Sequence, residues 1–325
     1  DLTIEAALRA IGDAGLTVDD IDGLSTYPGS GGPFGGASGA ELHDALRLSL
    51  NWRDGGLETS GQLGAVHKAV LAVGAGLARH VLVFRTVVEG SGGPVRASTA
   101  GGGMPPAFRY LIPYGAASAA NWIACYANRH MHDYGTTREQ LGAIAINARN
   151  HAASNPKAIY TEPMTMDDYL TARPVSEPFG LYDCDVPCDG STAVVVSHRD
   201  HSKDSPEVPV QVNALGTAHR GRPSWDQFDD LTTMAMRDSA ASLWERTELN
   251  PEDVDTAQLY DGFSWLTLAW IEAMGFCSRG EGGPFVEDGT RIAHGGALPL
   301  NTWGGQLSGG RLHGFGFLHE AVMQL

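Results

Sequence analysis

The stretch that decides the fold reads Gln258-Leu259-Tyr260-Asp261-Gly262-Phe263-Ser264-Trp265. The short apolar run that enters it predicts a strand, the Asp-Gly pair predicts a turn, and the apolar residues that follow predict a helix. Tyr260 and Asp261 are therefore expected at the carboxyl end of a strand. Ligands of α/β proteins bind at that end of a sheet, so both residues are candidates for function.

A second copy of this helix-turn-strand plan lies near the start of the chain. The acidic turn 19–22 (Asp-Asp-Ile-Asp) matches the acidic turn 252–255 (Glu-Asp-Val-Asp), and Tyr27 falls at the same offset as Tyr260. Segments 64–70 and 316–322 also resemble each other. Such spacing indicates an internal duplication, although short acidic turns can also recur by chance.

The duplication predicts two similar α/β halves. We place the first at residues 1–205, with an insertion at about 89–191, and the second at residues 206–325. In the first copy the helix at 64–78 leads into the apolar run 81–84, whereas the second copy reaches Leu325 inside the equivalent helix. The C-terminal half is therefore expected to be incomplete at its end.

Periodicity and capping residues predict several further elements. Apolar spacing gives a helix over residues 2–14, with Gly15 as its C-cap, and Thr137 is placed to begin another as its N-cap. The remaining expected elements are helices at 114–134 and 137–151, a strand at 192–197 and a loop at 91–106 that is rich in Gly, Ser and Pro.

Composition narrows the class of protein. With 325 residues, 42% of them hydrophobic, the chain can bury one large or two medium cores. A net charge of −16 argues against nucleic acid as a partner, because such binding needs a basic surface. The four cysteines form no CxxC pair, which suits the cytoplasm, and we expect neither a metal site nor a membrane span.

The joint order of several motifs resembles the thiolase superfamily, and within it the branch related to the sterol-carrier-protein-x thiolases, the bacterial "lipid-transfer" thiolase-like proteins. The resemblance covers nearly the whole chain and implies a duplicated αβαβα layered fold. The motifs that carry it are Ser60-Gly61 before a helix, Asp189-Gly190-Ser191-Thr192-Ala193, Tyr260-Asp261-Gly262-Phe263 and Leu300-Asn301-Thr302-Trp303-Gly304-Gly305.

The chain departs from a degradative thiolase at each catalytic motif. Glu58 or Thr59 stands where the family has its nucleophilic Cys, and Tyr260 stands where it has Asn or His. Arg311 replaces the histidine of the G-H-P motif, and His313 follows two residues later. Ordinary thiolysis is not expected, because a carboxylate cannot form the acyl-thioester and a Thr lacks the low pKa of a nucleophilic Cys.

The resemblance instead implies a carbon-carbon lyase on a thiolase scaffold. A subset of these proteins acts in bacterial steroid side-chain degradation, where a 17-hydroxy steroid CoA thioester is cleaved by a retro-aldol reaction to a 17-keto steroid and propionyl-CoA. This expectation needs no cofactor beyond the CoA of the substrate. Two alternatives remain: a thiolase or acyltransferase with another nucleophile, and a non-catalytic acyl-CoA or lipid carrier.

Candidate site residues follow from these positions. For catalysis we name Tyr260, whose phenol can donate and accept a hydrogen bond, together with Asp261, His313, Glu58 and Thr59. Each has a structural alternative: Asp261 as the N-cap of the next helix, and Tyr260 as a packed aromatic like Tyr27. For substrate binding we name Arg311, Tyr114, which has a core role as its alternative, and the possible oxyanion donors Gly305, Gly309 and Gly310.

Partners are implied by the resemblance alone. It implies an acyl-CoA substrate and a homodimer. It also implies a small OB-fold, zinc-ribbon partner protein, within a hydratase-aldolase complex.

Overall fold

The computed structural model describes residues 2–27, 36–56, 62–91, 109–219 and 230–325. The chain forms two compact units, each built from several segments. Unit 1 comprises Asp1–Val95, Pro187–Leu215 and Arg311–Leu325, and unit 2 comprises Arg96–Val186 and Gly216–Gly310. These units are defined by contacts within the folded chain, and the division into halves at residue 205 stays a prediction.

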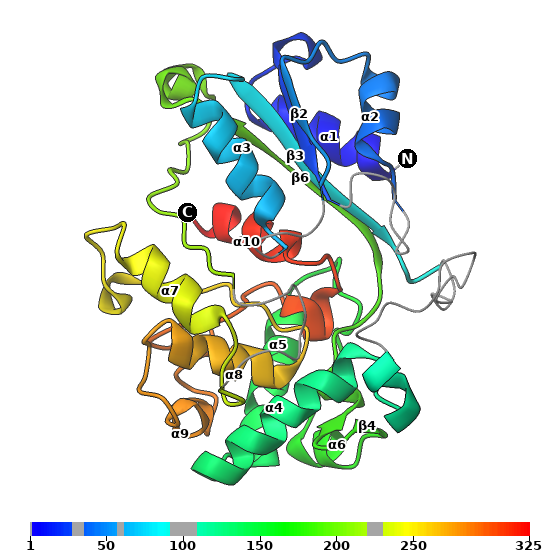
Figure 1. Ribbon diagram of the computed structural model, residues 1–325, viewed down its shortest axis with the longest axis vertical. Helices are drawn as coiled ribbons and strands as arrows, with labels where there is room; N and C mark the ends of the chain where they lie inside the picture. Colours follow the sequence, from blue (N-terminus) through cyan, green and yellow to red (C-terminus); the bar gives the residue numbers. More distant parts are fainter. Residues whose placement is uncertain (1, 28–35, 57–61, 92–108, 220–229) are drawn as a thin grey trace. The chain divides into compact units, whose positions relative to one another are not determined.

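Unit 1 is a mixed four-stranded sheet with helices on both faces (Figure 1). The strand order is β2-β1-β3-β6, with β1 parallel to β2 and β3, and β6 antiparallel to β3. The strands are β1 (Gly23–Thr26), β2 (Trp52–Asp54), β3 (His80–Val88) and β6 (Asp189–Ser197). The helices are α1 (Leu2–Asp13), α2 (Gly39–Leu46), α3 (Gly64–Gly74) and α10 (Phe315–Gln324), with 3-10 turns at Val18–Asp20 and Arg199–Asp204.

Alternation along β3 divides the core of unit 1 between the two sheet faces. Leu82 and Phe84 pack with α1 and α2, whereas Val81 and Val83 pack with α3 and Phe315. Successive side chains of a strand point to opposite faces, and helices cover both faces of this sheet, so all four side chains are fully buried. This three-layer arrangement confirms the α/β fold class expected from the sequence.

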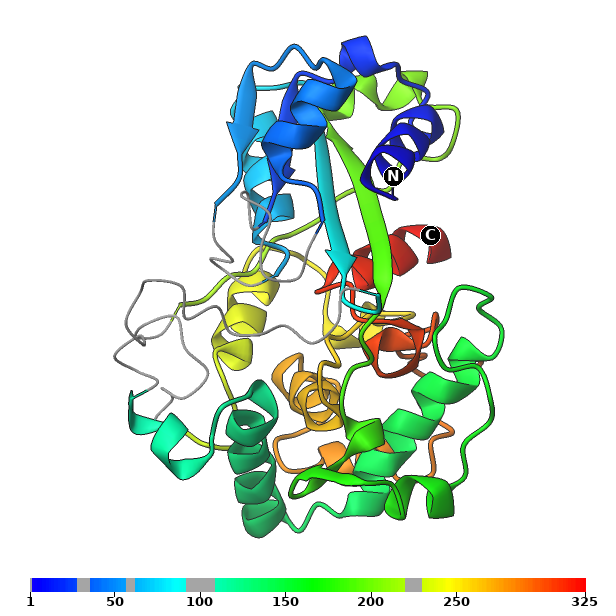
Figure 2. The same cartoon turned by 90° about the vertical axis from the view of Figure 1, so that its right-hand side faces the viewer.

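Unit 2 is mainly helical and is built around α5 (Arg138–Ala152), which lies against α6, α8 and α9 (Figure 2). Its other helices are α4 (Ala119–Tyr134), α6 (Met166–Leu170), α7 (Met236–Trp244), α8 (Ser264–Ala273) and α9 (Gly282–Val286). The short strands β4 (Pro174–Ser176) and β5 (Phe179–Gly180) form a hairpin. Single turns lie at Ile112–Tyr114, Leu181–Asp183, Pro251–Asp253 and, as a π-turn, Gly305–Gly309.

Several local predictions are confirmed. α1 ends at Asp13, and Gly15 adopts the left-handed backbone (φ 70°) that favours glycine after a helix. Thr137 is the N-cap of α5, where its hydroxyl accepts a hydrogen bond from the Gln140 N–H. The apolar run 81–84 lies inside the buried strand β3.

Other boundaries differ from the prediction. The helix expected from residue 114 begins at Ala119, and Tyr114 lies in a preceding 3-10 turn. β6 begins at Asp189, so the Asp189-Gly190-Ser191 motif pairs along the whole end of β3 rather than turning before the strand. The strand expected to end at Tyr260 is also wrong, because only Ala257 makes a bridge, to Leu300.

Candidate active site

The residues on both sides of Tyr260 are held by one side chain, that of Asn301. Its Oδ1 accepts a hydrogen bond from the Leu259 N–H at 2.8 Å, and its Nδ2 donates to the Leu259 carbonyl at 2.9 Å and to Asp261 Oδ2 at 3.1 Å. An amide side chain thus takes the place of a neighbouring strand. This explains why the predicted strand is absent although the segment remains fixed.

Asp261 is completely buried and caps a different element from the one predicted. Its Oδ1 accepts the Gln306 N–H at 2.7 Å, at the start of the π-turn Gly305–Gly309. The expected role as N-cap of α8 is wrong, because Phe263 occupies that position. Burial raises the pKa of Asp261 to about 7, and the hydrogen bonds from Gln306, Asn301 and Leu307 oppose this rise.

Tyr260 is half-buried at the edge of the core of unit 2. Its ring folds over the next glycine, since a Cβ on Gly262 would lie 2.7 Å from Tyr260 Cε1 and 2.9 Å from the phenol oxygen. Gly262 therefore leaves the space that the ring occupies. Asn301 fixes the two neighbours of Tyr260 in the chain, and the Tyr260 ring lies against Gly262. A phenol on a fixed segment can act as a proton donor from one place.

The glycines predicted as oxyanion donors form a tightly packed turn. The Gly309 N–H donates to Gly304 O at 3.2 Å and the Gly310 N–H to Gly305 O at 3.3 Å, so these two donors are used within the turn. Gly305 has φ 56°, and a Cβ there would lie 1.9 Å from Asp261 Oδ2. The close contact with the Asp261 carboxylate explains why residue 305 is a glycine. The oxyanion role of Gly305, Gly309 and Gly310 stays a prediction.

Unit 1 contains a second group of polar side chains, the Glu89 cluster: Glu89, Arg311, His313, Tyr27 and Arg85. Glu89 Oε2 accepts a hydrogen bond from Arg311 Nε at 2.6 Å and forms an ion pair with Nη2 at 2.5 Å. Glu89 Oε1 lies 3.2 Å from His313 Nε2. The Glu89 side chain is only 2% exposed. The structure therefore brings the predicted residues Arg311 and His313 together on one carboxylate.

Two groups of the Glu89 cluster, Glu89 and His313, have a lowered pKa, for different reasons. Burial by itself would raise the pKa of Glu89, but the hydrogen bonds and charges of His313 and Arg311 outweigh it and hold that pKa below its ordinary value. Burial also lowers the pKa of His313, and the neighbouring Arg85 and Arg311 add to this, while Glu89 opposes it.

Tyr27 holds the backbone at His313. Its hydroxyl donates to His313 O at 2.9 Å, and its own carbonyl accepts from Arg85 Nη1 at 3.1 Å. The Arg85 guanidinium also lies over the Tyr27 ring, 5.0 Å from its centroid. His313 has φ 48°, a left-handed backbone conformation that residues other than glycine rarely adopt. The contacts of Tyr27 therefore stabilise a strained backbone at His313.

The remaining predicted residues fall outside these two groups. Glu58 and Thr59 lie outside the described residues. Tyr114 is 87% exposed, so the alternative of a core role is wrong.

Tyr260, Asp261 and the glycine turn belong to unit 2, whereas Arg311 and His313 belong to unit 1.

Two important residues were missed by the sequence analysis. Glu89 directly follows the long buried strand β3, and an acid at the carboxyl end of a parallel strand is a signal that could have been used. Asn301 was quoted only as part of a motif. Its role depends on contacts with residues 42 and 40 positions earlier, for which the sequence carries no local signal.

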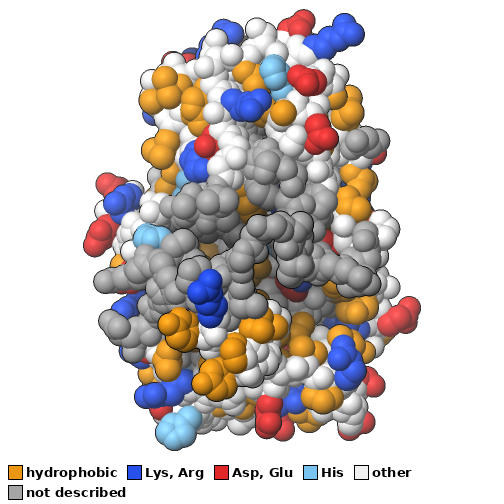
Figure 3. Space-filling model, turned by 45° about the vertical axis from the view of Figure 1, so that its right-hand side comes forward, with side chains coloured by type: hydrophobic (Ala, Val, Ile, Leu, Met, Phe, Trp, Pro, Cys, Tyr) orange, Lys and Arg blue, Asp and Glu red, His pale blue; other side chains and the backbone are white. Residues whose placement is uncertain are grey.

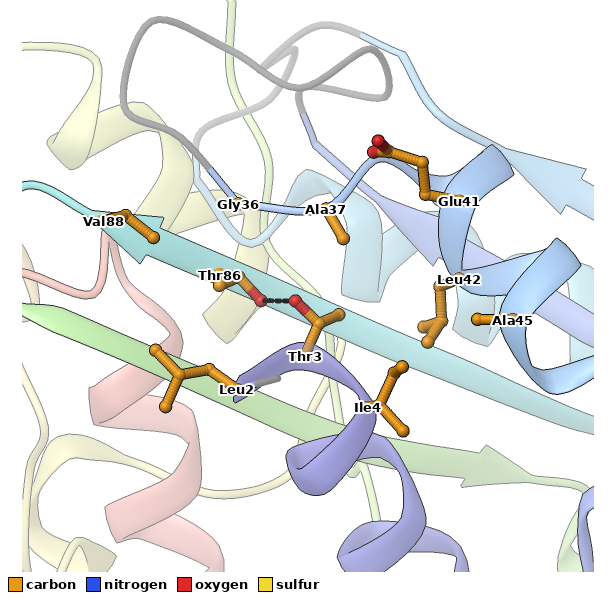
Figure 4. Close-up of a pocket in the computed structure, with 10 residues that line it drawn as sticks. All are labelled: Leu2, Thr3, Ile4, Gly36, Ala37, Glu41, Leu42, Ala45, Thr86 and Val88. Carbon is orange, nitrogen blue, oxygen red and sulfur yellow. Dashed lines mark hydrogen bonds between the residues drawn. The ribbon is translucent and has the colours of Figure 1, made fainter. Parts of the chain in front are cut away.

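An open pocket of about 620 Å³ lies on the other face of the sheet of unit 1 (Figure 4). It is lined by the start of α1, by α2 and by Thr86 and Val88 of β3, and the hydroxyls of Thr3 and Thr86 are hydrogen-bonded at 2.8 Å. Thr86 and Val88 alternate with Arg85 and Glu89 along the chain. The pocket is therefore separate from the Glu89 cluster.

On the face seen in Figure 3 the described residues form no cluster of basic side chains. In Figure 3 the blue Lys and Arg side chains of the described residues lie singly among acidic and uncharged ones. Within the described ranges no group of three or more His, Cys, Asp or Glu side chains is arranged to bind a metal ion. Among the described helices, none combines the length and the apolar character needed to cross a membrane.

The chain is similar in sequence to a known protein family and to two enzymes of known activity. Residues 216–325 match the family described as "Thiolase C-terminal domain-like". The chain is 35% identical to the steroid side-chain-cleaving aldolase of Thermomonospora curvata, over 99% of this chain and 84% of that protein. It is 34% identical to the 17-hydroxy-3-oxo-4-pregnene-20-carboxyl-CoA lyase of Mycobacterium tuberculosis, over 100% of this chain and 86% of that protein.

A solved structure gives the same result. The fold matches that of the "Ltp2-ChsH2(DUF35) aldolase" with a TM-score of 0.86 and 35% sequence identity, covering 99% of this chain and 83% of that one.

Proposed function

We propose that this chain, which belongs to the thiolase superfamily and to the same family as the two aldolases just described, is a carbon-carbon lyase acting on a CoA thioester. The substrate class is a 17-hydroxy steroid with a three-carbon side chain that ends in the thioester, and the products are a 17-keto steroid and propionyl-CoA. The observation that carries this proposal is the identity of 34–35% to both enzymes over essentially the whole chain.

The reaction is a proton transfer coupled to cleavage of one C–C bond. A base removes the proton of the 17-hydroxyl, the oxygen forms the ketone, and the bond to the side chain breaks. The electron pair of that bond moves onto the α-carbon and is delocalised onto the thioester oxygen as an enolate. An acid then protonates this carbon to give propionyl-CoA. No electrons enter or leave, so the proposed reaction needs no cofactor.

Within this proposal the described residues divide into contacting and supporting groups. The half-buried Tyr260 is the proposed acid for the enolate, and His313 is proposed to handle the hydroxyl proton. Asp261 is completely buried against the glycine turn, so we propose a supporting role for it. Glu58 and Thr59 stay candidates from the sequence, as do Arg311 and Tyr114 for the CoA ester.

The proposal extends to assembly. The similar solved structure carries the name of a second protein, "ChsH2(DUF35)", beside the aldolase. We propose that this chain likewise acts with a small OB-fold, zinc-ribbon partner, in a hydratase-aldolase complex, and that it forms a homodimer in the cytoplasm.

The deciding experiment is to incubate the full chain with a 17-hydroxy steroid side-chain CoA thioester, with and without a partner of that type, and to follow the products by mass spectrometry. We expect the 17-keto steroid and propionyl-CoA in equal amounts. Absence of both products under both conditions would overturn the proposal. A covalent acyl-protein in the intact mass would favour the acyltransferase alternative, and tight binding without turnover would favour the carrier.

Tyr260→Phe tests the residue assignment separately. We expect kcat to fall by about 10²- to 10⁴-fold with little change in KM, since the ring is kept and only the acid is lost. Tyr110→Phe is the matched control: it removes the hydroxyl of an exposed tyrosine with no proposed role, and we expect a much smaller effect. Full activity of Tyr260→Phe would refute the role of Tyr260 while leaving the reaction class intact.

A further inference from the structure

Helix α5 lies beside the segment 300–309, which carries Asn301 and the π-turn (Figure 1). The backbone bends sharply in this segment, since Asn301 has φ 50° and Gly304 has φ 106°. A left-handed residue other than glycine persists where its surroundings hold it in place. The contacts that hold Asn301 therefore also fix the residues beside Tyr260, because the Asn301 amide binds them.

One face of α5 and the turn after it supply hydrogen-bond partners for this segment. Asn147 and His151 are spaced four residues apart, so they lie on the same face of the helix. Three side chains bond to backbone carbonyls of the segment: Asn147 to Leu300, His151 to Leu300 and Asn301, and Asn155 to Trp303. With Nδ1 at 2.9 Å from Leu300 O and 3.3 Å from Asn301 O, the His151 imidazole contacts the peptide groups on both sides of the Asn301 Cα.

The hydrogen bonds of His151 determine where its proton lies. A carbonyl oxygen can only accept, so Nδ1, which faces two carbonyls, must carry the hydrogen. On the other side of the ring the His294 N–H donates to Nε2 at 3.1 Å, and Nε2 can accept this bond only through its lone pair. The almost completely buried ring is therefore in the neutral Nδ1–H form.

We propose that His151 is a positioning residue for Tyr260 and acts through Asn301. The Nδ1–H holds the peptide groups at Asn301. The Asn301 side chain in turn binds Leu259 and Asp261, which flank the phenol in the chain. All these residues belong to unit 2. The consequence for catalysis rests on the proposed function, in which Tyr260 protonates the enolate, and His151 itself makes no contact with the substrate.

The tautomer can be measured in the full chain without any substrate. In ¹⁵N NMR, with the ring assigned from the backbone resonances of His151, we expect a protonated Nδ1 and an unprotonated Nε2 at pH 7. A proton on Nε2, or on both nitrogens, would overturn the proposal. This measurement uses the wild-type chain, so it decides even if a variant fails to fold.

Two variants separate the two hydrogen bonds of the ring. In His151→Asn the amide nitrogen lies as many bonds from the backbone as Nδ1, so the variant keeps the donor toward Leu300 O and loses the acceptor for the His294 N–H. In His151→Gln the amide oxygen reaches the position of Nε2, so the variant keeps the acceptor and loses the donor. Each variant loses one hydrogen bond, so each is the matched control of the other, and a merely structural role predicts equal effects.

Hydrogen exchange of the Leu259 amide reports the positioning directly, because this N–H donates to Asn301 Oδ1. We expect its exchange to be about 10-fold faster in His151→Gln than in His151→Asn. The amide of Leu82, in the inner strand β3 of unit 1, should exchange equally in both. Equal exchange of the Leu259 amide in the two variants would refute the assignment.

Kinetics supply the second reading. A misplaced acid slows the chemical step more than it weakens substrate binding, so kcat of His151→Gln should fall by about 10²-fold with little change in KM. His151→Asn should keep most of the wild-type kcat, and equal losses in both variants would overturn the positioning role. If the tautomer and the exchange pattern are as expected but the wild-type chain cleaves no CoA thioester, the proposed function fails and not the positioning by His151.

Discussion

Glu89 and Asp261 are both buried carboxylates, yet their surroundings differ in kind. Glu89 faces a guanidinium and an imidazole, with the Arg311 and His313 side chains 26% and 12% exposed. Asp261 is completely buried and faces backbone N–H groups and the Asn301 amide. Burial raises the pKa of Asp261 to about 7, whereas the cationic partners hold the pKa of Glu89 below its ordinary value.

The difference teaches how the same functional group serves two purposes. Backbone N–H groups cannot release a proton, so the contacts of Asp261 fix the shape of the π-turn. An imidazole can gain and lose one, so the contact of Glu89 with His313 can support proton transfer. Four substitutions and one control variant test this contrast.

The largest effect is expected where the Asp261 contacts are tightest. Gly305→Ala would place a Cβ 1.9 Å from Asp261 Oδ2 at a residue with φ 56°. Overpacking and backbone strain together should lower the free energy of unfolding by roughly 3 to 5 kcal/mol. Urea denaturation measures it.

Gly289→Ala is the matched control, since Gly289 also has positive φ but an added Cβ would meet nothing within 4 Å. Its cost should be only about 1 kcal/mol. Equal effects of the two substitutions would show that the Asp261 contact does not constrain the turn.

Asp261→Asn tests the protonation of the buried carboxyl. Between the ordinary pKa of 3.8 and about 7, the folded chain holds a proton that the unfolded chain has released. Wild-type stability should therefore fall relative to the variant as pH rises through this window, by at most about 1.4 kcal/mol per pH unit. Urea denaturation from pH 4 to 8 would show it, and a difference independent of pH would contradict the raised pKa.

Glu89→Gln should show the opposite trend. The depressed pKa means that the ionised carboxylate stabilises the fold above the unfolded pKa, and this stabilisation is lost as pH falls through the folded pKa. We expect a loss of about 2 kcal/mol at pH 7, less than for a fully buried pair because Arg311 is partly exposed, and a difference that shrinks below about pH 4. If the stability difference between wild type and variant changed with pH in the same direction for Glu89→Gln as for Asp261→Asn, the two carboxylates would not differ as proposed.

Arg311→Lys should have the smallest effect. Lys keeps the charge but replaces the two-donor contact with Glu89 by a single one. We expect a loss of about 1 kcal/mol in urea denaturation, because Glu89 keeps a cationic partner. A loss as large as that of Glu89→Gln would show that the positive charge alone does not stabilise the carboxylate.

Local sequence signals were sufficient for much of the fold. The cap at Thr137, the glycine after α1 and the apolar run in β3 depend on neighbours within a few residues, and all three are confirmed. The strand before Tyr260 was wrong for a physical reason. Backbone pairing stops at Ala257, and the N–H and carbonyl of Leu259 bond to the side chain of Asn301 instead. Strand propensity cannot show that an amide side chain takes these bonds.

The sequence by itself determined the α/β class, the family motifs and the positions where this chain departs from a thiolase, because these depend on the order and identity of residues. The tertiary structure decided which of the named residues meet. Glu89 and Arg311 are 222 positions apart, and Asp261 and Gln306 are 45 positions apart. Contacts at such separations arise from the packing of whole elements, so only the folded chain shows that one carboxylate pairs with His313 and the other holds a turn.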